Sequence, residues 1–316
     1  MTTSTNDLEK RLIELKKDVP TRGFKRHPIR LKSINELDPE LQSPAVSALA
    51  AQEPLQSIIA FPPQIHRGWH YVPKQALLFR PTEVIHLMAS IWPEQEPQVT
   101  HLKGSDLIYM NVKLILLYGL LEVAGQGDST PTRLSVEFNN VVWDQLYPHL
   151  RQLLKASQPT CNASTDKATY SPAARQVSEK LPLKFSNGLW IFGLLPGEGL
   201  EELVYQPGTW KPLFLFRRKA LTADSMLLLT TNYMVVIREE LGFPYGWILT
   251  YIPRTSIVRI QNQRLNLWNE LTVQLKRGDQ TAEYKISLDE GSTLDWRLKW
   301  TRNNFLWEEL PEAAVS

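Results

Sequence analysis

The sequence has few of the features that mark secreted, membrane or nucleic-acid-binding proteins. It holds a single cysteine, Cys161, in 316 residues, so no disulfide can form within the chain. Its net charge is only +2, which excludes a strong overall attraction to nucleic acid. The longest apolar run, near residues 114–121, is too short to cross a bilayer as a helix. The acidic residues Asp7 and Glu9 do not fit a secretory signal. We therefore predict a soluble, cytoplasmic protein.

Signatures of common active sites are also missing. There is no GxxxxGK[ST] loop, no GxGxxG that opens a helix and no GxSxG nucleophile elbow. The glycine-rich stretch GLLPGEG, residues 193–199, precedes a strand-like run and is interpreted as a turn. Cys161 has no histidine near it in sequence, which argues against a catalytic thiol. We predict no catalytic residues, no cofactor and no enzymatic activity. The enzymatic alternative is a hydrolase with an unrecognised site between domains.

The histidines do not form a convincing metal site. His66 and His70 are four residues apart, a spacing that holds zinc on a helix, but prolines and a glycine around them argue against a helix. His86 and His101 fall on neighbouring predicted strands and can approach each other across a sheet. We interpret all four as ordinary surface or packing residues and predict no metal.

The N-terminal part of the chain is patterned as a helix followed by an arm. Residues 7–17 place leucines at helical spacing, which predicts a short amphipathic helix. Residues 22–32 are rich in lysine and arginine, and residues 35–56 are rich in Pro, Gln, Ser and Ala. We predict that residues 35–56 are irregular.

Beyond residue 57 the pattern becomes that of β-strands. Short runs of β-branched and aromatic residues alternate with turn formers, which is typical of consecutive antiparallel strands. Helical spacing returns at residues 141–155 and again at 292–310, where Ser292 and Asp295 predict a capped start. Between them, small and polar residues dominate 158–182, which predicts a linker.

The second half of the chain repeats the first at a fixed distance. LLLTTNYMVVI, residues 227–237, follows LLFRPTEVIHL, residues 77–87, by 150 positions. When residues 77–138 and 227–288 are aligned without a gap, a modest excess of positions is apolar in both copies. A slip of one residue turns every side chain of a strand to the other face, so unrelated segments rarely stay in phase. We predict that each copy forms antiparallel strands in two packed sheets, closed by its terminal helix.

Three segments of the second copy carry a family resemblance. They are LPGEGLEELVY at 195–205 with its PGE turn, MLLLTTNYMVVI at 226–237, and WILTYIPRTSIVRIQ at 247–261. With them, residues 195–305 resemble the bacterial pleckstrin-homology-like group, which is similar to GRAM domains. The first copy has no PGE turn and matches only through the repeat. The resemblance implies a non-enzymatic scaffold that presents loops or a strand edge to lipids, peptides or other proteins.

The predicted fold is therefore mainly β, with two tandem pleckstrin-homology-like barrels or sandwiches. Each consists of strands followed by a C-terminal helix, and a helical arm precedes them. The predicted domains are the arm (1–56), the first pleckstrin-homology-like domain (57–157), the linker (158–182) and the second domain (183–310).

The basic triplet Arg217, Arg218 and Lys219 is the candidate binding site. It lies between two strand-like runs, and the resemblance implies that the first strand connection collects basic residues for anionic head groups. Cations near an anionic surface contribute about 1 kcal/mol each. The alternative is a solvated strand edge kept basic to prevent edge pairing. We predict an adaptor for a protein partner, with recruitment to an anionic membrane through Arg217–Lys219 as the alternative.

A second basic segment lies in the arm. Arg22, Lys25, Arg26 and Arg30 surround Phe24, a combination that also occurs in nucleic-acid-binding segments. We predict a solubilising tail rather than nucleic-acid binding. The sequence does not specify the oligomeric state.

Overall fold

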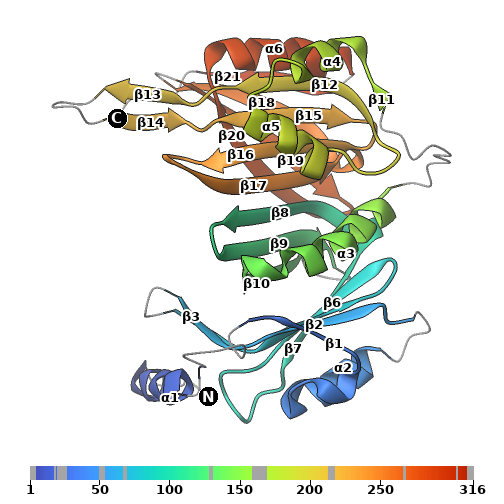
Figure 1. Cartoon of the computed structure of the whole chain (residues 1–316), viewed down its shortest axis with the longest axis vertical. Coiled ribbons are helices and arrows are strands. Elements are labelled where there is room, and N and C mark those ends of the chain that lie inside the picture. Colours follow the sequence, from blue (N-terminus) through green and yellow to red (C-terminus); the bar gives the residue numbers. More distant parts are fainter. Residues whose placement is uncertain are drawn as a thin grey trace. The chain divides into compact units, whose positions relative to one another are not determined.

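The computed structural model describes residues 5–17, 19, 27–49, 54–66, 70–127, 131–158, 169–212, 218–265, 268–303 and 305–311. More residues lie in strands than in helices, so the mainly β class is confirmed (Figure 1). None of the sheets formed by these residues closes into a barrel. None of the described helices combines the length and the hydrophobicity needed to cross a membrane.

Contacts divide the chain into two compact units. Unit 1 comprises Met1–Ser105, Leu117–Leu120 and Thr132–Ser157. Unit 2 comprises Asp106–Leu116, Leu121–Pro131 and Gln158–Ser316. The chain thus passes from one unit to the other within the first copy of the repeat.

Unit 1 contains a five-stranded sheet with the order β1-β2-β5-β6-β7, and β3 and β4 pair as a separate hairpin. Its strands are β1 (Ile29–Leu31), β2 (Ser57–Phe61), β3 (Gln64–His66), β4 (His70–Val72), β5 (Gln75–Phe79), β6 (Glu83–Met88), β7 (Gln98–Lys103) and, from Thr132 on, β10 (Pro131–Asn139). Its helices are α1 (Thr5–Lys17), the 3-10 turns η2 (Ile34–Glu36) and η4 (Asn140–Val142), α2 (Pro39–Ala48) and α3 (Trp143–Ala156).

The N-terminal part of the chain contains two helices, of which α1 is predicted from the sequence and α2 is not. The amphipathic helix expected at 7–17 is present as α1. The segment 35–56 is expected to be irregular, but its described residues include α2, which begins at Pro39, a favourable first position of a helix. Leu41 and Ala45 of α2 are buried against Leu78 and Leu87 of the sheet. Packing of this apolar face stabilises a helix that composition alone does not reveal.

Unit 2 contains two sheets and the separate hairpin of β13 and β14. In the first, the strand order within the unit is β9-β8-β17-β16-β15-β12-β11, and in the second it is β20-β19-β18-β21. The strands are β8 (Leu107–Ile115), β9 (Tyr118–Gln126, in this unit from Leu121 on), β11 (Thr169–Tyr170), β12 (Gly199–Gln206), β13 (Thr209–Pro212), β14 (Arg218–Thr222), β15 (Ser225–Thr230), β16 (Tyr233–Glu240), β17 (Phe243–Pro253), β18 (Ile257–Leu265), β19 (Trp268–Arg277), β20 (Gln280–Leu288) and β21 (Leu306–Leu310). The helices are α4 (Pro172–Ser178), α5 (Leu183–Gly188), the π-helix η5 (Leu189–Gly193), the 3-10 turn η6 (Arg254–Ser256) and α6 (Glu290–Arg302).

Helix α6 closes the core of unit 2. Its side chains Trp296 and Trp300 are fully buried among residues of both sheets, and it lies along β12 and β21 (Figure 1). The helix predicted for 292–310 is wrong at both ends. Asp289, not Ser292, caps the start by accepting the Ser292 backbone N–H at 2.9 Å. Residues 306–310 form β21, because they pair in parallel with β18 instead of continuing the helix.

The other face of the first sheet in unit 2 is covered as well. The π-helix η5 contacts β16, and the hydroxyl of Tyr251 in β17 donates to the carbonyl oxygen of Phe192 at 2.9 Å. Helix α2 gives the sheet of unit 1 a similar cover. Strands covered on both faces have continuous apolar runs instead of alternating ones, which accounts for the fully buried β5 and β15.

The structure confirms the repeat in strand order and register. The pair Leu78↔Ile85 in β5 and β6 corresponds to Leu228↔Val235 in β15 and β16, 150 positions later. The pairing of β6 with β7 corresponds in the same way to that of β16 with β17. The turn η3 (Gly104–Asp106) precedes η6 by the same distance.

The two copies differ in length at one place, the hairpin that follows the first strand. β2 pairs with β5 as β12 pairs with β15, but Ile58 corresponds to Leu203, a distance of only 145. The second copy therefore has additional residues between its first strand and β15. They lie in the hairpin of β13 and β14, which corresponds to the shorter hairpin of β3 and β4.

Candidate functional site

The hairpin of β13 and β14 carries the basic residues that the sequence singled out. Arg218 and Lys219 lie in β14, opposite Pro212 and Lys211 of β13. Arg217 and the Arg218 side chain lie outside the described residues, as do Arg22, Lys25, Arg26 and Cys161. The structure therefore describes the side chain of Lys219 alone among the predicted triplet.

Two threonines fix the base of this hairpin. The Thr209 backbone N–H donates to the Thr222 Oγ1 at 3.0 Å, and the two hydroxyl oxygens lie 2.8 Å apart. This pairing holds β13 and β14 together where they join the body of unit 2, so Lys211 and Lys219 lie on paired strands.

Lys211 stands directly opposite Lys219, and both side chains are exposed. Neither lysine forms an ion pair with a residue that the structure describes. Like charges directly opposite each other destabilise a pair of strands. Lys211 is not among the residues predicted from the sequence, because it is eight positions before Lys219 and only the hairpin register brings the two together.

An exposed tryptophan adjoins the two lysines. Trp210 precedes Lys211 in β13, and 49% of its surface is exposed to solvent. Tryptophan is enriched in binding interfaces, since its ring supplies a large contact area at little cost in conformational entropy. The hairpin thus combines unneutralised positive charge with an apolar contact surface.

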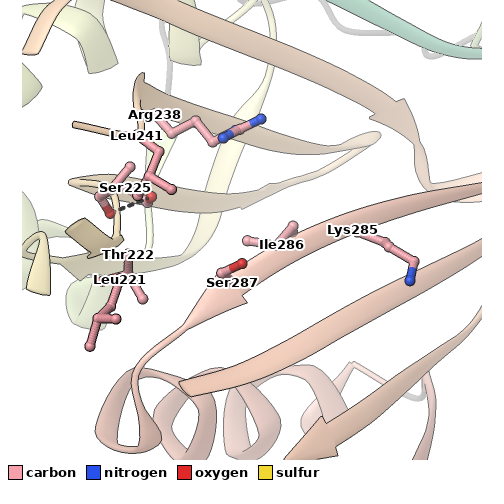
Figure 2. Close-up of a pocket in the computed structure, with 9 residues that line it drawn as sticks. Leu221, Thr222, Ser225, Arg238, Leu241, Lys285, Ile286 and Ser287 are labelled. Carbon is pink, nitrogen blue, oxygen red and sulfur yellow. Dashed lines mark hydrogen bonds between the residues drawn. The ribbon is translucent and has the colours of Figure 1, made fainter. Parts of the chain in front are cut away.

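A small pocket lies where the hairpin meets the two sheets. It has a volume of about 80 Å³ and is lined by Leu221, Thr222, Ala223, Ser225, Arg238, Leu241, Lys285, Ile286 and Ser287. Figure 2 shows Leu221 and Thr222 coming from one strand and Lys285, Ile286 and Ser287 from another. Small-molecule sites usually measure roughly 300–1,000 Å³, so this pocket fits a single side chain or a small anion, not a nucleotide.

Arg238 is the most notable polar residue of this pocket. Its Nε is buried and has no hydrogen-bond partner among the described residues. The neighbouring Lys285 is already used, because its Nζ lies 2.7 Å from Glu270 Oε1, and this bond raises the pKa of Lys285. Arg238 is therefore the group of the pocket with spare capacity to bind an anionic oxygen. No motif around Arg238 distinguished it in the sequence.

The histidines behave as packing and pairing residues. His86 is buried and lies 2.9 Å from Gln75 Oε1, and burial lowers its pKa to about 4. His101 pairs with Glu83 at 2.9 Å. His66 and His70 face each other across the hairpin of β3 and β4, not on a helix. No cluster of three or more potential metal ligands occurs among the residues that the structure places.

Arg30 is described by the structure, unlike the three other basic residues around Phe24. It lies in β1, opposite Ile59 of β2, and with Lys32 it lines an open hollow of about 500 Å³. Burial lowers the pKa of His149, and the charge of Arg30 adds to this effect. Arg30 is thus part of an ordered sheet.

Comparison with protein-family models gave no match, and comparison with curated proteins gave none either. The function has to be inferred from the chemistry of the site itself.

Proposed function

We propose that this chain is a non-catalytic adaptor that binds an acidic segment of a protein partner through its basic hairpin. The basic hairpin is defined here as β13 and β14 with Lys211, Arg218 and Lys219. The observation that carries the proposal is the pair Lys211↔Lys219, two exposed lysines held opposite each other without a described counter-charge.

The repulsion between Lys211 and Lys219 is relieved when an anionic group binds between them. An acidic side chain placed between Lys211 and Lys219 replaces a repulsive contact with two attractive ones. Trp210 then supplies the apolar part of the contact, and Arg238 offers a donor to an anionic group that enters the pocket. Complementary charge of this kind favours specificity and fast association.

The architecture supports tandem pleckstrin-homology-like domains at 57–157 and 183–310, joined by residues 158–182. In each copy, paired strands are followed by a 3-10 turn, three more strands and a helix. This order fits the strands-then-helix unit that the family resemblance implies. A cytoplasmic location belongs to the same proposal, and cell fractionation tests it.

The test uses a fluorescein-labelled peptide of alternating glutamate and leucine and measures binding by anisotropy. The variant Lys211→Glu/Lys219→Glu is expected to bind at least about tenfold more weakly, since tenfold corresponds to only about 1.4 kcal/mol. The matched control is Lys276→Glu, an exposed strand lysine opposite Thr281, which should bind like the unmodified chain. Equal affinity of the double variant and the control contradicts the proposal.

A second candidate is recruitment to an anionic membrane surface by the same hairpin. The observation in its favour is the exposed Trp210 beside Lys211, because aromatic rings with cations also suit the membrane–water interface. Sedimentation with vesicles of phosphatidylcholine, with and without phosphatidylserine, separates the two candidates. Equal sedimentation with both vesicle types eliminates the membrane alternative. No particular arrangement of the described residues favours the hydrolase alternative, and we do not propose it.

A further inference from the structure

Strands β7 and β17 are equivalent in the repeat, but they have different neighbours. The outer edge of β17 is paired with β8 in the register Trp247↔Leu114, Leu249↔Val112 and Tyr251↔Met110. Among the described strands, β7 is instead the last of its sheet. One copy therefore shows a strand bound at the edge that the other copy leaves open.

The backbone of β7 directs the N–H and C=O groups of alternate residues toward its outer edge, as binding of a further strand requires. The Gly104 N–H donates to the Thr82 carbonyl at 2.7 Å, and this pair continues the register Glu83↔Lys103. Hydrogen-bonded and non-bonded pairs alternate along antiparallel strands. Val99, His101 and Lys103 therefore direct their N–H and C=O groups away from β6, toward the open edge.

The second copy has the same alternation of hydrogen bonds, and it agrees with the observed pairing of β17 with β8. The Arg254 N–H donates to the Asn232 carbonyl at 2.8 Å, so Leu249 and Tyr251 face away from β16. These are the residues that pair with β8. They correspond to Val99 and His101, 150 positions earlier. The edge of β7 thus presents hydrogen-bonding groups at the positions where β17 uses them.

The side chains on β7 are exposed where those on β17 are buried. Val99 is 38% exposed, whereas its counterpart Leu249 is fully buried. The side chain of His101 is 45% exposed, whereas Tyr251 is buried. In the tautomer whose Nδ1–H donates to Glu83 Oε1 at 2.9 Å, Nε2 of His101 carries no hydrogen and can accept from a donor on an added strand.

A second copy of this chain is not the occupant that the fold favours. The counterpart of β8 in the second copy is β18, and β21 already occupies its outer edge. Glu308 of β21 pairs with Arg259 at 3.0 Å, and Glu309 accepts from Asn262 at 2.7 Å. The strand that would complete β7 by analogy is therefore covered within its own chain.

We propose that the outer edge of β7 binds an extended segment of another protein, which adds to the sheet as an antiparallel strand. By analogy with β8, the residue opposite Val99 is apolar, as Val112 is opposite Leu249. The residue opposite Lys103 is acidic, because it faces a cationic side chain, and the residue opposite His101 is a donor such as glutamine, because it faces the acceptor Nε2. Read from its N-terminus, the segment has the pattern acid-x-donor-x-apolar. This surface lies in unit 1, goes beyond the adaptor function proposed above and is independent of the basic hairpin.

The probe is a labelled peptide containing Glu-Thr-Gln-Thr-Val, tested on the full chain with Lys211→Glu/Lys219→Glu so that the hairpin does not bind it. The peptide should slow hydrogen exchange at the amides of Val99, His101 and Lys103. A peptide N-methylated at the glutamate, the glutamine and the valine keeps its charge but loses the donors that face β7. It should bind at least about tenfold more weakly.

A protein variant provides the second arm. Val99→Pro removes an N–H that faces outward and leaves the hydrogen bonds to β6 intact, so it should abolish peptide binding. Equal binding of the methylated and unmethylated peptides overturns the proposal, because charge alone then explains binding. Self-association of the full chain that disappears in Val99→Pro also overturns it, because a second copy then occupies the edge.

Discussion

The two copies of the repeat place the same strand in two environments. β7 and β17 pair with the preceding strand in one register, yet β17 is an interior strand and β7 is an edge of the described sheet. Their sequences follow the environment: Leu249 and Tyr251 are apolar and buried, whereas Val99 and His101 are exposed. Pairing with the preceding strand thus fixes the register of each copy. Whether another strand pairs with the outer edge of β7 or β17 decides whether that edge is free to bind a partner.

The cores of the two copies differ in polarity as well. In the first copy, His86 and Gln75 form a buried hydrogen-bonded pair. The positions 150 residues later hold Val236 and Ser225, which are buried in a sheet covered on both sides. The helices that close the two copies bury leucines in α3 and tryptophans in α6. The core of the first copy therefore contains a buried polar pair, whereas the same two positions of the second copy hold a valine and a serine.

The largest expected contrast between the copies is in hydrogen exchange. The amides of Leu249 and Tyr251 bond to β8, so they should be protected up to the global free energy of unfolding, roughly 5–15 kcal/mol. The amides of Val99 and His101 face the open edge and should exchange close to the unprotected rate. Exchange measured by NMR checks this, and equal protection at both strands would show that a partner already covers β7.

The next largest effect should come from the tryptophans of α6. Trp296→Ala leaves a cavity in the core of unit 2 and should lower the free energy of unfolding by about 3–5 kcal/mol. Trp296→Phe should cost much less, because the buried Nε1 has no described partner and its loss removes a penalty of about 1–3 kcal/mol. Urea denaturation measures both. Leu298→Ala on the exposed face is the control and should change stability by less than about 0.5 kcal/mol.

His86 should make the stability of the first copy depend on pH. Burial lowers its folded-state pKa from 6.5 to about 4, so the unfolded chain binds the proton first as pH falls. Stability should therefore decrease as pH falls from about 6.5 to about 4, by roughly 3 kcal/mol in total. Replacing the pair by its second-copy equivalents, His86→Val/Gln75→Ser, should remove this contribution.

The measurement for His86 is the difference in free energy of unfolding between the unmodified chain and the double variant across this pH range. Subtraction cancels the carboxylates that both chains share. A difference that does not change with pH would show that His86 is protonated or exposed in the folded state.

The smallest expected effect concerns the basic hairpin, which the first copy lacks. Lys219→Glu converts the repulsive pair with Lys211 into an attractive one and should raise the free energy of unfolding by about 0.2–1 kcal/mol. The gain should shrink in high salt, because both groups are exposed. Lys219→Gln should fall between the two. A loss of stability in Lys219→Glu would contradict the cross-strand geometry.

Much of the fold is predictable, because the spacing of apolar residues along the chain indicates which segments form helices and strands. The gap-free repeat predicts the shared strand order, and the leucine spacing predicts α1. The errors fall where local patterns compete with packing: prolines and glutamines mask Leu41 and Ala45 of α2, and β21 resembles the end of a helix until it pairs with β18. The predicted triplet at Arg217 locates the hairpin, but Lys211 and Arg238 become visible only in the folded register.

By itself, the sequence determined the alternation of apolar residues, their recurrence after 150 positions and the absence of a disulfide within the chain, because these depend only on the order of side chains. The tertiary structure decided which strand edges are covered. Sheet edges are closed by hydrogen bonds between residues far apart in sequence, such as those joining β8 to β17, and no local pattern encodes that choice. The opposition of Lys211 and Lys219 and the open edge of β7 follow from such long-range pairing.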